Sequence, residues 1–293
     1  MPILGIMASA WRVIKTFGTW TSRTLPSALQ WEFLSYGNGV YIGLVYGSTT
    51  SLYSTNGTTW TTKTMPSAAA WSGSVYGNST FVATSNTTTS ATSPDGITWT
   101  ARTMPSATWV SVTFSQSQFV AVAYGGSQVA TSPDGITWTS RTNSQSATWI
   151  VVASGGGAYV AIFNGSGNAS SSSSNGITWS ARTMPSTASW QTLAYASGVF
   201  HSACYGASNA ATSPDGVTWT ARTMPTAGQF YIAAGAPDLF CIITRAADTY
   251  TSPDGITWTQ RTMVSGTWNS VGYGNNLFVA TTSTTTGASA TWA

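Results

Sequence analysis

The stretch Ser93-Pro-Asp-Gly-Ile-Thr-Trp99 decides the fold, because copies of it recur along the whole chain. It returns at 132–138, at 252–258 and, with Val in place of Ile, at 213–219. Copies at 54–60 and 173–179 carry Asn-Gly instead of Asp-Gly, and Phe-Gly-Thr-Trp at 17–20 is a remnant. The tryptophans that end the copies lie 39 to 41 residues apart, at Trp20, Trp60, Trp99, Trp138, Trp179, Trp219 and Trp258. The 293-residue chain therefore holds seven copies of one repeat of about forty residues.

One repeat contains four predicted strands. In the copy at 109–142, runs rich in β-branched and aromatic residues occupy 109–114, 119–124, 128–131 and 136–142, and Gly, Pro, Asp or Ser separates them. No segment of the chain has a sustained helical period. Four antiparallel strands at even spacing are typical of a propeller blade. A β-solenoid is the alternative, but its rungs are usually shorter, and seven equal units favour a closed ring.

The two ends of the sequence complement each other. After Trp258 the chain supplies only three further predicted strands, at 268–273, 277–282 and 288–292, while 18–24 reads as a lone fourth strand. Pairing of 19–24 with 288–292 would complete the seventh blade and leave the sheet without a free edge. We therefore predict an all-β, seven-bladed propeller over residues 18–293 as a single domain, with 1–17 as an N-terminal arm or anchor.

The repeated residues are predicted to build the blades. Asp-Gly or Asn-Gly between the third and fourth strands is a hairpin signal, in which Gly takes the positive φ and the Asx side chain caps backbone N–H groups. Ile97, Trp99 and Ala101 are predicted to face inward along the fourth strand. The seven repeat-ending tryptophans and the turn acids are assigned this structural role, the acids being Asp95, Asp134, Asp215 and Asp254.

Charge placement suggests one binding surface. Each repeat has a cation three positions after its tryptophan, at Arg23, Lys63, Arg102, Arg141, Arg182, Arg222 and Arg261. Because strands alternate in direction, these cations should form a ring on one face or rim, away from the ring of turn acids. A structural role for each cation is one interpretation. The other is a docking surface for an acidic partner or an anionic glycan.

Two resemblances follow from these residues. Ser-Pro-Asp-Gly-Ile-Thr-Trp resembles a shortened Asp-box, the Ser-x-Asp-x-Gly-x-x-Trp hairpin of sialidases and related BNR-type propellers, with the residue between Asp and Gly missing. In that family the Asp-box is a fold element remote from catalysis, so the resemblance implies a propeller and no activity. The opening Pro2-Ile-Leu-Gly-Ile-Met-Ala-Ser9 and the charge-poor body resemble structural proteins of tailed bacteriophages.

Composition excludes several classes of function. Charged residues make up 6% of the chain and the net charge is +3, without a Lys/Arg run, so we expect no nucleic-acid partner. No apolar window approaches the ~20 residues of a membrane helix, so no membrane insertion is expected. Cys204 and Cys241 fall at different phases of neighbouring repeats, which disfavours a disulfide. No metal or cofactor motif occurs, and none is predicted.

No catalytic site is predicted, because a catalytic group should break the repeat. His201, the only histidine, replaces the Val or Ile that follows the first aromatic of the second strand. Within the predicted propeller, the other non-repeated charges are Glu32, Asp238, Asp248 and Arg245, and no pair of carboxylates is evidently placed for glycoside hydrolysis. Glu32 is the only Glu, so the residues that sialidase activity needs are missing. A sialidase-like glycoside hydrolase is therefore disfavoured.

The sequence leaves two functional hypotheses. In the first, the protein is a non-enzymatic structural or adhesive module of a phage virion, such as a capsid decoration, fibre or tail-tip protein. It would contact other virion proteins through residues 1–17 and could bind a host receptor or cell-surface glycan. In the second, it is a free, secreted lectin that holds sugars between blades on aromatic faces, with avidity from repeated weak sites.

Overall fold

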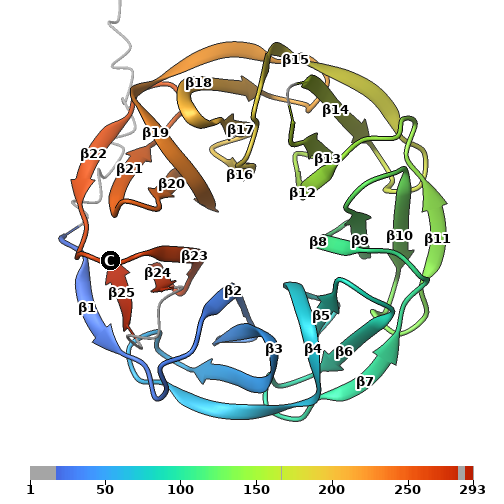
Figure 1. Ribbon diagram of the computed structural model, residues 1–293, viewed down its shortest axis with the longest axis vertical. Coiled ribbons are helices and arrows are strands. Elements are labelled where there is room, and N and C mark those ends of the chain that lie inside the picture. The colour runs from blue at the N-terminus through green and yellow to red at the C-terminus, as the bar shows by residue number, and fades with distance from the viewer. Residues whose placement is uncertain (1–17, 166, 283–287, 293) are drawn as a thin grey trace, which may run out of the picture.

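The protein is an all-β propeller in which sheets stand around a central channel (Figure 1). The computed structural model describes residues 18–165, 167–282 and 288–292, and these contain no helix. It follows that no helix in the described ranges could span a membrane. The arm predicted at 1–17 lies outside the described residues.

Three sheets have four strands each, in the order that the repeat predicts from the channel outward. The first contains β8 (Trp109–Ser115), β9 (Gln118–Ala123), β10 (Gln128–Ser132) and β11 (Thr139–Thr142). The second contains β12 (Trp149–Gly155), β13 (Ala158–Phe163), β14 (Gly167–Ser173) and β15 (Ser180–Ala188). The third contains β23 (Trp268–Gly274), β24 (Leu277–Thr282), β25 (Ala288–Trp292) and, from the other end of the chain, β1 (Thr21–Thr24).

The other strands form two larger sheets, where separate four-stranded sheets were predicted. One has six strands, namely β2 (Trp31–Gly37), β3 (Val40–Ser54), β4 (Thr61–Gly77), β5 (Thr80–Ser85), β6 (Thr89–Ser93) and β7 (Thr100–Thr103). The other has seven, namely β16 (Ala194–Ala196), β17 (Val199–Ala203), β18 (Tyr205–Ser213), β19 (Thr220–Ala236), β20 (Leu239–Thr244), β21 (Asp248–Ser252) and β22 (Thr259–Thr262). The sheets merge because β4 and β19 are each 17 residues long and stay extended where a loop was expected. Pairs such as Tyr46↔Ala70 and Tyr205↔Gln229 hold these connecting segments in the ladder.

The two ends of the chain close the ring, as the sequence predicts. β1 pairs antiparallel with β25 in the register Thr21↔Thr291 to Thr24↔Ala288. The Trp292 indole N–H donates to the Gly18 carbonyl, and the rings of Trp20 and Trp292 stack with centroids 6.0 Å apart. This pairing covers a strand edge that would otherwise be exposed.

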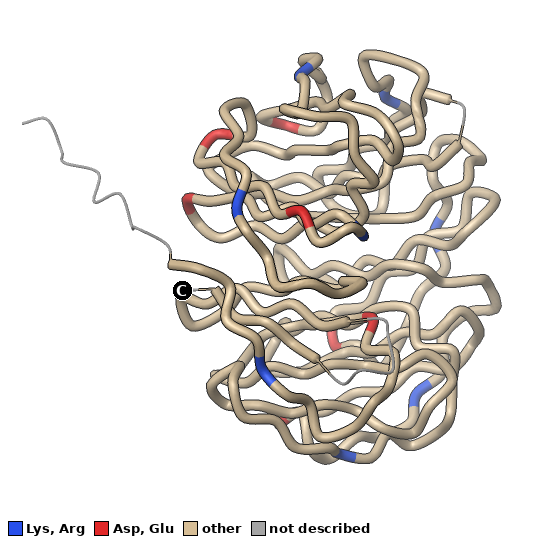
Figure 2. Tube along the Cα trace, turned by 60° about the vertical axis from the view of Figure 1, so that its left-hand side comes forward, with Lys and Arg blue, Asp and Glu red and all other residues tan. Residues whose placement is uncertain are grey.

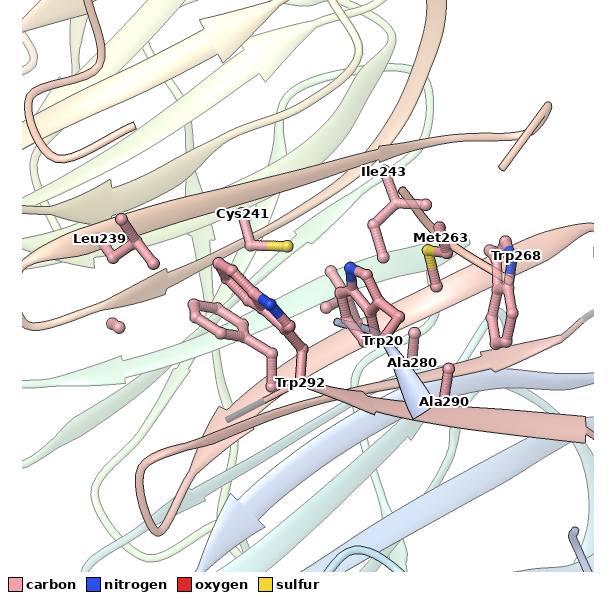
Figure 3. Packing of buried hydrophobic residues seen from close by; sticks show 12 residues of the cluster. Trp20, Leu239, Cys241, Ile243, Met263, Trp268, Ala280, Ala290 and Trp292 are labelled. Carbon is pink, nitrogen blue, oxygen red and sulfur yellow. The ribbon is translucent and has the colours of Figure 1, made fainter. Parts of the chain in front are cut away.

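The core lies between neighbouring sheets. At the closure, Cys241 and Ile243 of β20 pack onto Trp292 and Trp20, beside Met263 (Figure 3). Each repeat has one tryptophan or phenylalanine that is at most 1% exposed. It lies where an innermost strand or the inner half of β4 or β19 begins, or, for Trp190, shortly before β16: Trp31, Trp71, Trp109, Trp149, Trp190, Phe230 and Trp268. Replacing one such ring by Ala commonly costs roughly 3–5 kcal/mol, so these residues hold the innermost strands in place.

Close approach of neighbouring sheets requires glycine at the end of an innermost strand. A Cβ built on Gly274 would lie 2.0 Å from the Tyr36 ring of β2, and one on Gly37 would meet the Tyr76 ring at the same distance. The innermost strands β23 and β2, which come from the two ends of the chain, therefore approach one another in the same way as β2 and β4, which belong to one six-stranded sheet.

Candidate functional site

The channel contains a cavity of about 410 Å³ lined by the innermost strand segments. Seven segments contribute, at 32–34, 72–74, 110–112, 150–151, 191–193, 231–233 and 269–271. Each follows directly after the buried tryptophan or phenylalanine that starts an innermost strand. The buried ring therefore fixes the position at which the chain enters the channel.

A β-bulge re-aims one side chain in each of these segments. In β2 the register passes from Trp31↔Val45 to Phe33↔Leu44, so Glu32 is an extra residue without a partner in the ladder. The same shift in five other segments leaves Ser72, Val110, Ile150, Tyr231 and Asn269 unpaired. In the remaining segment, the amides of Gln191 and Thr192 both donate to the Ala203 carbonyl, at 3.0 and 3.2 Å, so Gln191 occupies the equivalent place. Bulges bend a strand and redirect its side chains, and they occur often beside binding sites.

These bulge residues divide the mouth of the channel into two arcs. In ring order, Gln191, Tyr231, Asn269, Glu32 and Ser72 carry hydrogen-bonding side chains on neighbouring innermost strands. Val110 and Ile150 occupy the remaining part of the ring and are apolar. We call these the polar arc and the apolar arc. The mouth can therefore form hydrogen bonds mainly on one side.

A second set of side chains lies next to the mouth, at a position that holds Tyr or Asn in five repeats and Arg245 in one. Each follows the second strand of its repeat, and its backbone N–H donates to the residue just before the buried aromatic, as in Asn164 to Thr148 at 3.0 Å and Tyr205 to Ser189 at 2.8 Å. Arg245 donates in the same way to Gln229 at 3.3 Å. These bonds hold Asn164, Tyr205 and Arg245 beside the starts of the innermost strands.

Electrostatics at the mouth come from one acid and one base. The half-buried position of Glu32 raises the pKa of its carboxyl above the usual value, and the positive charge of Arg245 partly offsets this effect. The guanidinium of Arg245 lies over the Tyr231 ring, 4.0 Å from its centroid, in a cation–π contact. Glu32 is the only carboxylate among the residues that line the cavity.

The predicted ring of cations lies on the outer rim, and the structure does not bring its members together. Five of the cations lie on the outermost strands of their sheets (Figure 1): Arg23 on β1, Arg102 on β7, Arg141 on β11, Arg182 on β15 and Arg261 on β22. The other two lie on the strands that two sheets share, Lys63 on β4 and Arg222 on β19. Figure 2 shows the charged positions distributed over the molecule without a single patch. Each arginine is half-buried and its Nε donates to a Thr or Ser hydroxyl of the next strand inward, at 2.9–3.3 Å. Lys63 lies over the Tyr53 ring, 5.4 Å from its centroid.

The predicted turn acids cap the turns between the third and fourth strands. Asp95 Oδ1 accepts from the amides of Ile97 and Thr98, both at 2.8 Å, and from the Ser93 hydroxyl at 2.9 Å. The Thr98 hydrogen bond is the main cause that lowers the pKa of Asp95, while burial opposes it. The pKa values of Asp134, Asp215 and Asp254 are lowered as well. The acids of this set are therefore occupied with the backbone of their own turns.

The inward orientation predicted for Ile97 and Ala101 is wrong. Ile97 belongs to the capped turn and is 40% exposed, since the strand begins only at Thr100, and Ala101 is exposed as well. Of the repeat-ending tryptophans, Trp20, Trp60, Trp99, Trp179 and Trp219 are buried, and Trp138 and Trp258 are half-buried.

His201 and the two cysteines are inaccessible, whereas Asp238 is exposed and Asp248 is half-buried, and neither lines the channel cavity. His201 is fully buried against Phe240 and Trp258, neither ring nitrogen has a hydrogen-bond partner, and burial lowers its pKa to about 3. Cys204 and Cys241 are buried, free thiols. Within the described ranges no group of His, Cys, Asp and Glu could hold a metal ion.

Sequence reasoning did not single out Gln191, Tyr231, Asn269, Asn164 or Tyr205, and gave Arg245 no role. A signal was present at the bulge positions, because Gln191, Tyr231 and Asn269 differ from repeat to repeat while the aromatic before each of them recurs. That difference alone could have marked the mouth as the part of the ring that is not needed to build a blade.

Comparison with known proteins supports the fold. No known family profile matches the chain, and no curated protein matches it in sequence. Among solved structures, virginiamycin B lyase from Staphylococcus aureus is similar at TM-score 0.82 and 9% identity, over 94% of this chain and 99% of that one. YCF48 bound to D1 peptide is similar at TM-score 0.75 and 13% identity, over 94% and 96%. The Pan2 WD40 domain of Neurospora crassa is similar at TM-score 0.72 and 6% identity, over 93% and 94%. The chain therefore has a fold that an enzyme, a peptide-bound protein and a WD40 domain all use, and a likeness at such low identity defines the fold alone.

Proposed function

We propose that this protein is a seven-bladed propeller that binds a polar ligand of the glycan class at the mouth of its channel, without catalysing a reaction. The seven segments that line the cavity support this blade number. The six- and seven-stranded sheets then each represent two blades fused through β4 or β19.

The polar arc is the observation that carries the proposal. Four neighbouring positions, Gln191, Tyr231, Asn269 and Glu32, carry amide, phenol or carboxyl groups, which suit the hydroxyls of a sugar, and they line a preformed cavity, whereas the Ser72 hydroxyl is buried. Val110 and Ile150 on the opposite side offer apolar contact to the C–H surface of the same ligand.

Binding without catalysis is proposed because, among the described residues, neither a pair of carboxylates nor a histidine lines the cavity. Glycoside hydrolysis commonly uses two carboxylates, whereas Glu32 is the single one lining the cavity. A variant of virginiamycin B lyase that lacks one histidine is described as catalytically inactive. In the present chain the only histidine, His201, is buried outside the channel lining.

A single site at the mouth replaces the multivalent lectin suggested by the sequence. The seven aromatics that start the innermost strands are buried, so a sugar could stack on them only if neighbouring blades separated. The cost of such separation would exceed the ~1–3 kcal/mol that a stacking contact of this kind commonly returns.

The proposed setting is a phage particle, in which the propeller is a rigid adhesive module and residues 1–17 contact another virion protein. The opening sequence and the low charge content support this setting. Mass spectrometry of purified particles tests it. Fixed stoichiometry is expected, and absence from particles would favour a secreted, free binding protein.

A glycan array followed by titration calorimetry tests the binding site. Replacing Gln191 and Asn269 together by Ala should weaken binding tenfold or more, because two hydrogen bonds to the ligand are lost, each worth about 1 kcal/mol. Arg141→Gln on the rim is the matched control and should leave the affinity unchanged. If the rim variant weakens binding and the mouth variant does not, the site lies on the cation ring and the proposal is wrong.

A further inference from the structure

A pocket of about 250 Å³ lies beside the polar arc, and its lining contains no acid. The pocket is lined by six residues, namely Asn164, Ser189, Gln191, Tyr205, Tyr231 and Arg245. All six are polar, two are aromatic, and one is a permanent cation. The volume is slightly smaller than that of typical drug-sized pockets, so it suits one monosaccharide unit better than an extended chain.

Arg245 is available for a ligand. It is exposed, and the contacts recorded for its side chain are the stacking on Tyr231 and the charge of Glu32, with no carboxylate of the described residues in an ion pair with it. Stacking holds the guanidinium plane in place and leaves the N–H groups at its edge free to donate. Such an edge fits a carboxylate through two parallel hydrogen bonds.

The neighbouring amides add hydrogen-bond donors. The Asn164 side-chain amide donates to Gln191 Oε1 at 2.8 Å and to the Trp190 carbonyl at 3.1 Å. Because Oε1 of Gln191 accepts that bond, its NH₂ group is left to donate toward a ligand. The pocket therefore presents a fixed cation and an amide donor, which is the complement of an anion.

We propose that this pocket binds the carboxylate of an acidic sugar unit, with Arg245 as the bidentate donor and Tyr205 and Tyr231 beside the sugar ring. The inference rests on the proposed glycan-binding function and specifies its ligand class. Glu32, farther along the polar arc, carries the charge that would repel a carboxylate, so the acidic group lies on the Arg245 side of the mouth.

The test compares acidic oligosaccharides with their carboxyl-reduced forms, in which each carboxylate has become a primary alcohol. The panel contains glucuronate-, galacturonate- and sialic-acid-terminated oligosaccharides, and affinity is measured by calorimetry with the whole chain. At least one acidic form should bind tenfold or more tightly than its reduced form. Arg245→Gln should abolish that difference, while Arg222→Gln on the rim, which removes the same charge elsewhere, should preserve it.

Different outcomes separate this inference from the proposed function. Equal binding of acidic and reduced forms, unchanged in Arg245→Gln, overturns the acidic subsite and leaves a neutral-glycan site. Binding of neither form across the panel and of no glycan on the array overturns both. A sulfated oligosaccharide that binds as tightly as the carboxylate form would overturn the specificity for a carboxylate. Because Arg245 is exposed and makes no core contact, the variant should fold, and its near-UV circular dichroism should match the parent's.

Discussion

A disulfide across the closure seam should form in one register and should stabilise the ring. Ser22 lies opposite Ala290 in the β1–β25 ladder, and directly opposite residues in an antiparallel pair have Cα atoms about 4.5–5.5 Å apart, within the range for a disulfide. Ser22→Cys with Ala290→Cys therefore places two thiols on the same side of the sheet. The native Cys204 and Cys241 should not compete, because both are buried and burial raises the pKa of their thiols.

The expected gain follows from the length of the loop that the bridge closes. A loop of about 270 residues gives a loop-entropy limit of about 5–6 kcal/mol, of which engineered bridges usually deliver about 2–4 kcal/mol. With an unfolding entropy of roughly 2.1 cal/mol/K per residue, this gain raises Tm by roughly 3–7 °C.

Non-reducing mass spectrometry and thermal unfolding with and without reductant measure both quantities. Ser22→Cys with Ser289→Cys is the matched control, because a shift by one residue places the second thiol on the opposite side of the strand. Efficient bridging in the control but not in the test pair would refute the register. A complete bridge in the test pair without a rise in Tm would refute the stabilisation expected from closing this loop.

Three further predictions concern single side chains. Asp95→Ala should lower the free energy of unfolding in urea by about 1–2 kcal/mol, because two capping hydrogen bonds from backbone amides are lost. Asp95→Asn should change it by no more than about 0.5 kcal/mol, because Asn175 accepts the same pair of hydrogen bonds in its own turn. Equal losses in the two variants would contradict the capping role. In the folded protein His201 keeps a pKa of about 3 against an ordinary value of 6.5, so the unfolded chain takes up a proton first as the pH falls. The free energy of unfolding should therefore decrease as the pH drops from about 6.5, by about 2 kcal/mol at pH 5. His201→Val, which installs the residue found at the equivalent Val160, should remove this pH dependence, and an unchanged pH profile would show that the dependence has another origin. The pKa of Glu32 is raised in the folded protein, so the contribution of this residue to stability declines as the pH rises through that pKa. In thermal unfolding, Glu32→Gln should therefore stabilise the protein by less than about 1 kcal/mol at pH 8 and should have no effect at pH 4. An equal effect at both pH values would refute an electrostatic cause.

The candidate site was much harder to predict than the fold. A β-bulge depends on how two strands pair, so nothing local to Glu32 or Tyr231 indicates that each is the extra residue of its strand. The placement of Arg245 over Tyr231 depends likewise on the turn after β20 returning beside the start of the innermost strand. Ile97 shows the same limit, because strict alternation predicted an inward side chain, whereas the Asp95 cap extends the turn and the strand begins only at Thr100.

The sequence by itself determined the repeat, its four strands and the pairing of the two ends, because period, turn chemistry and strand order are all local or one-dimensional properties. Only the tertiary structure decided that β4 and β19 would join neighbouring blades, that the cations would lie apart on the rim, and that non-repeated polar groups would meet at one mouth. The physical reason is that closing the ring brings equivalent positions from far along the chain around one axis. Side chains that are never neighbours in sequence then share one cavity.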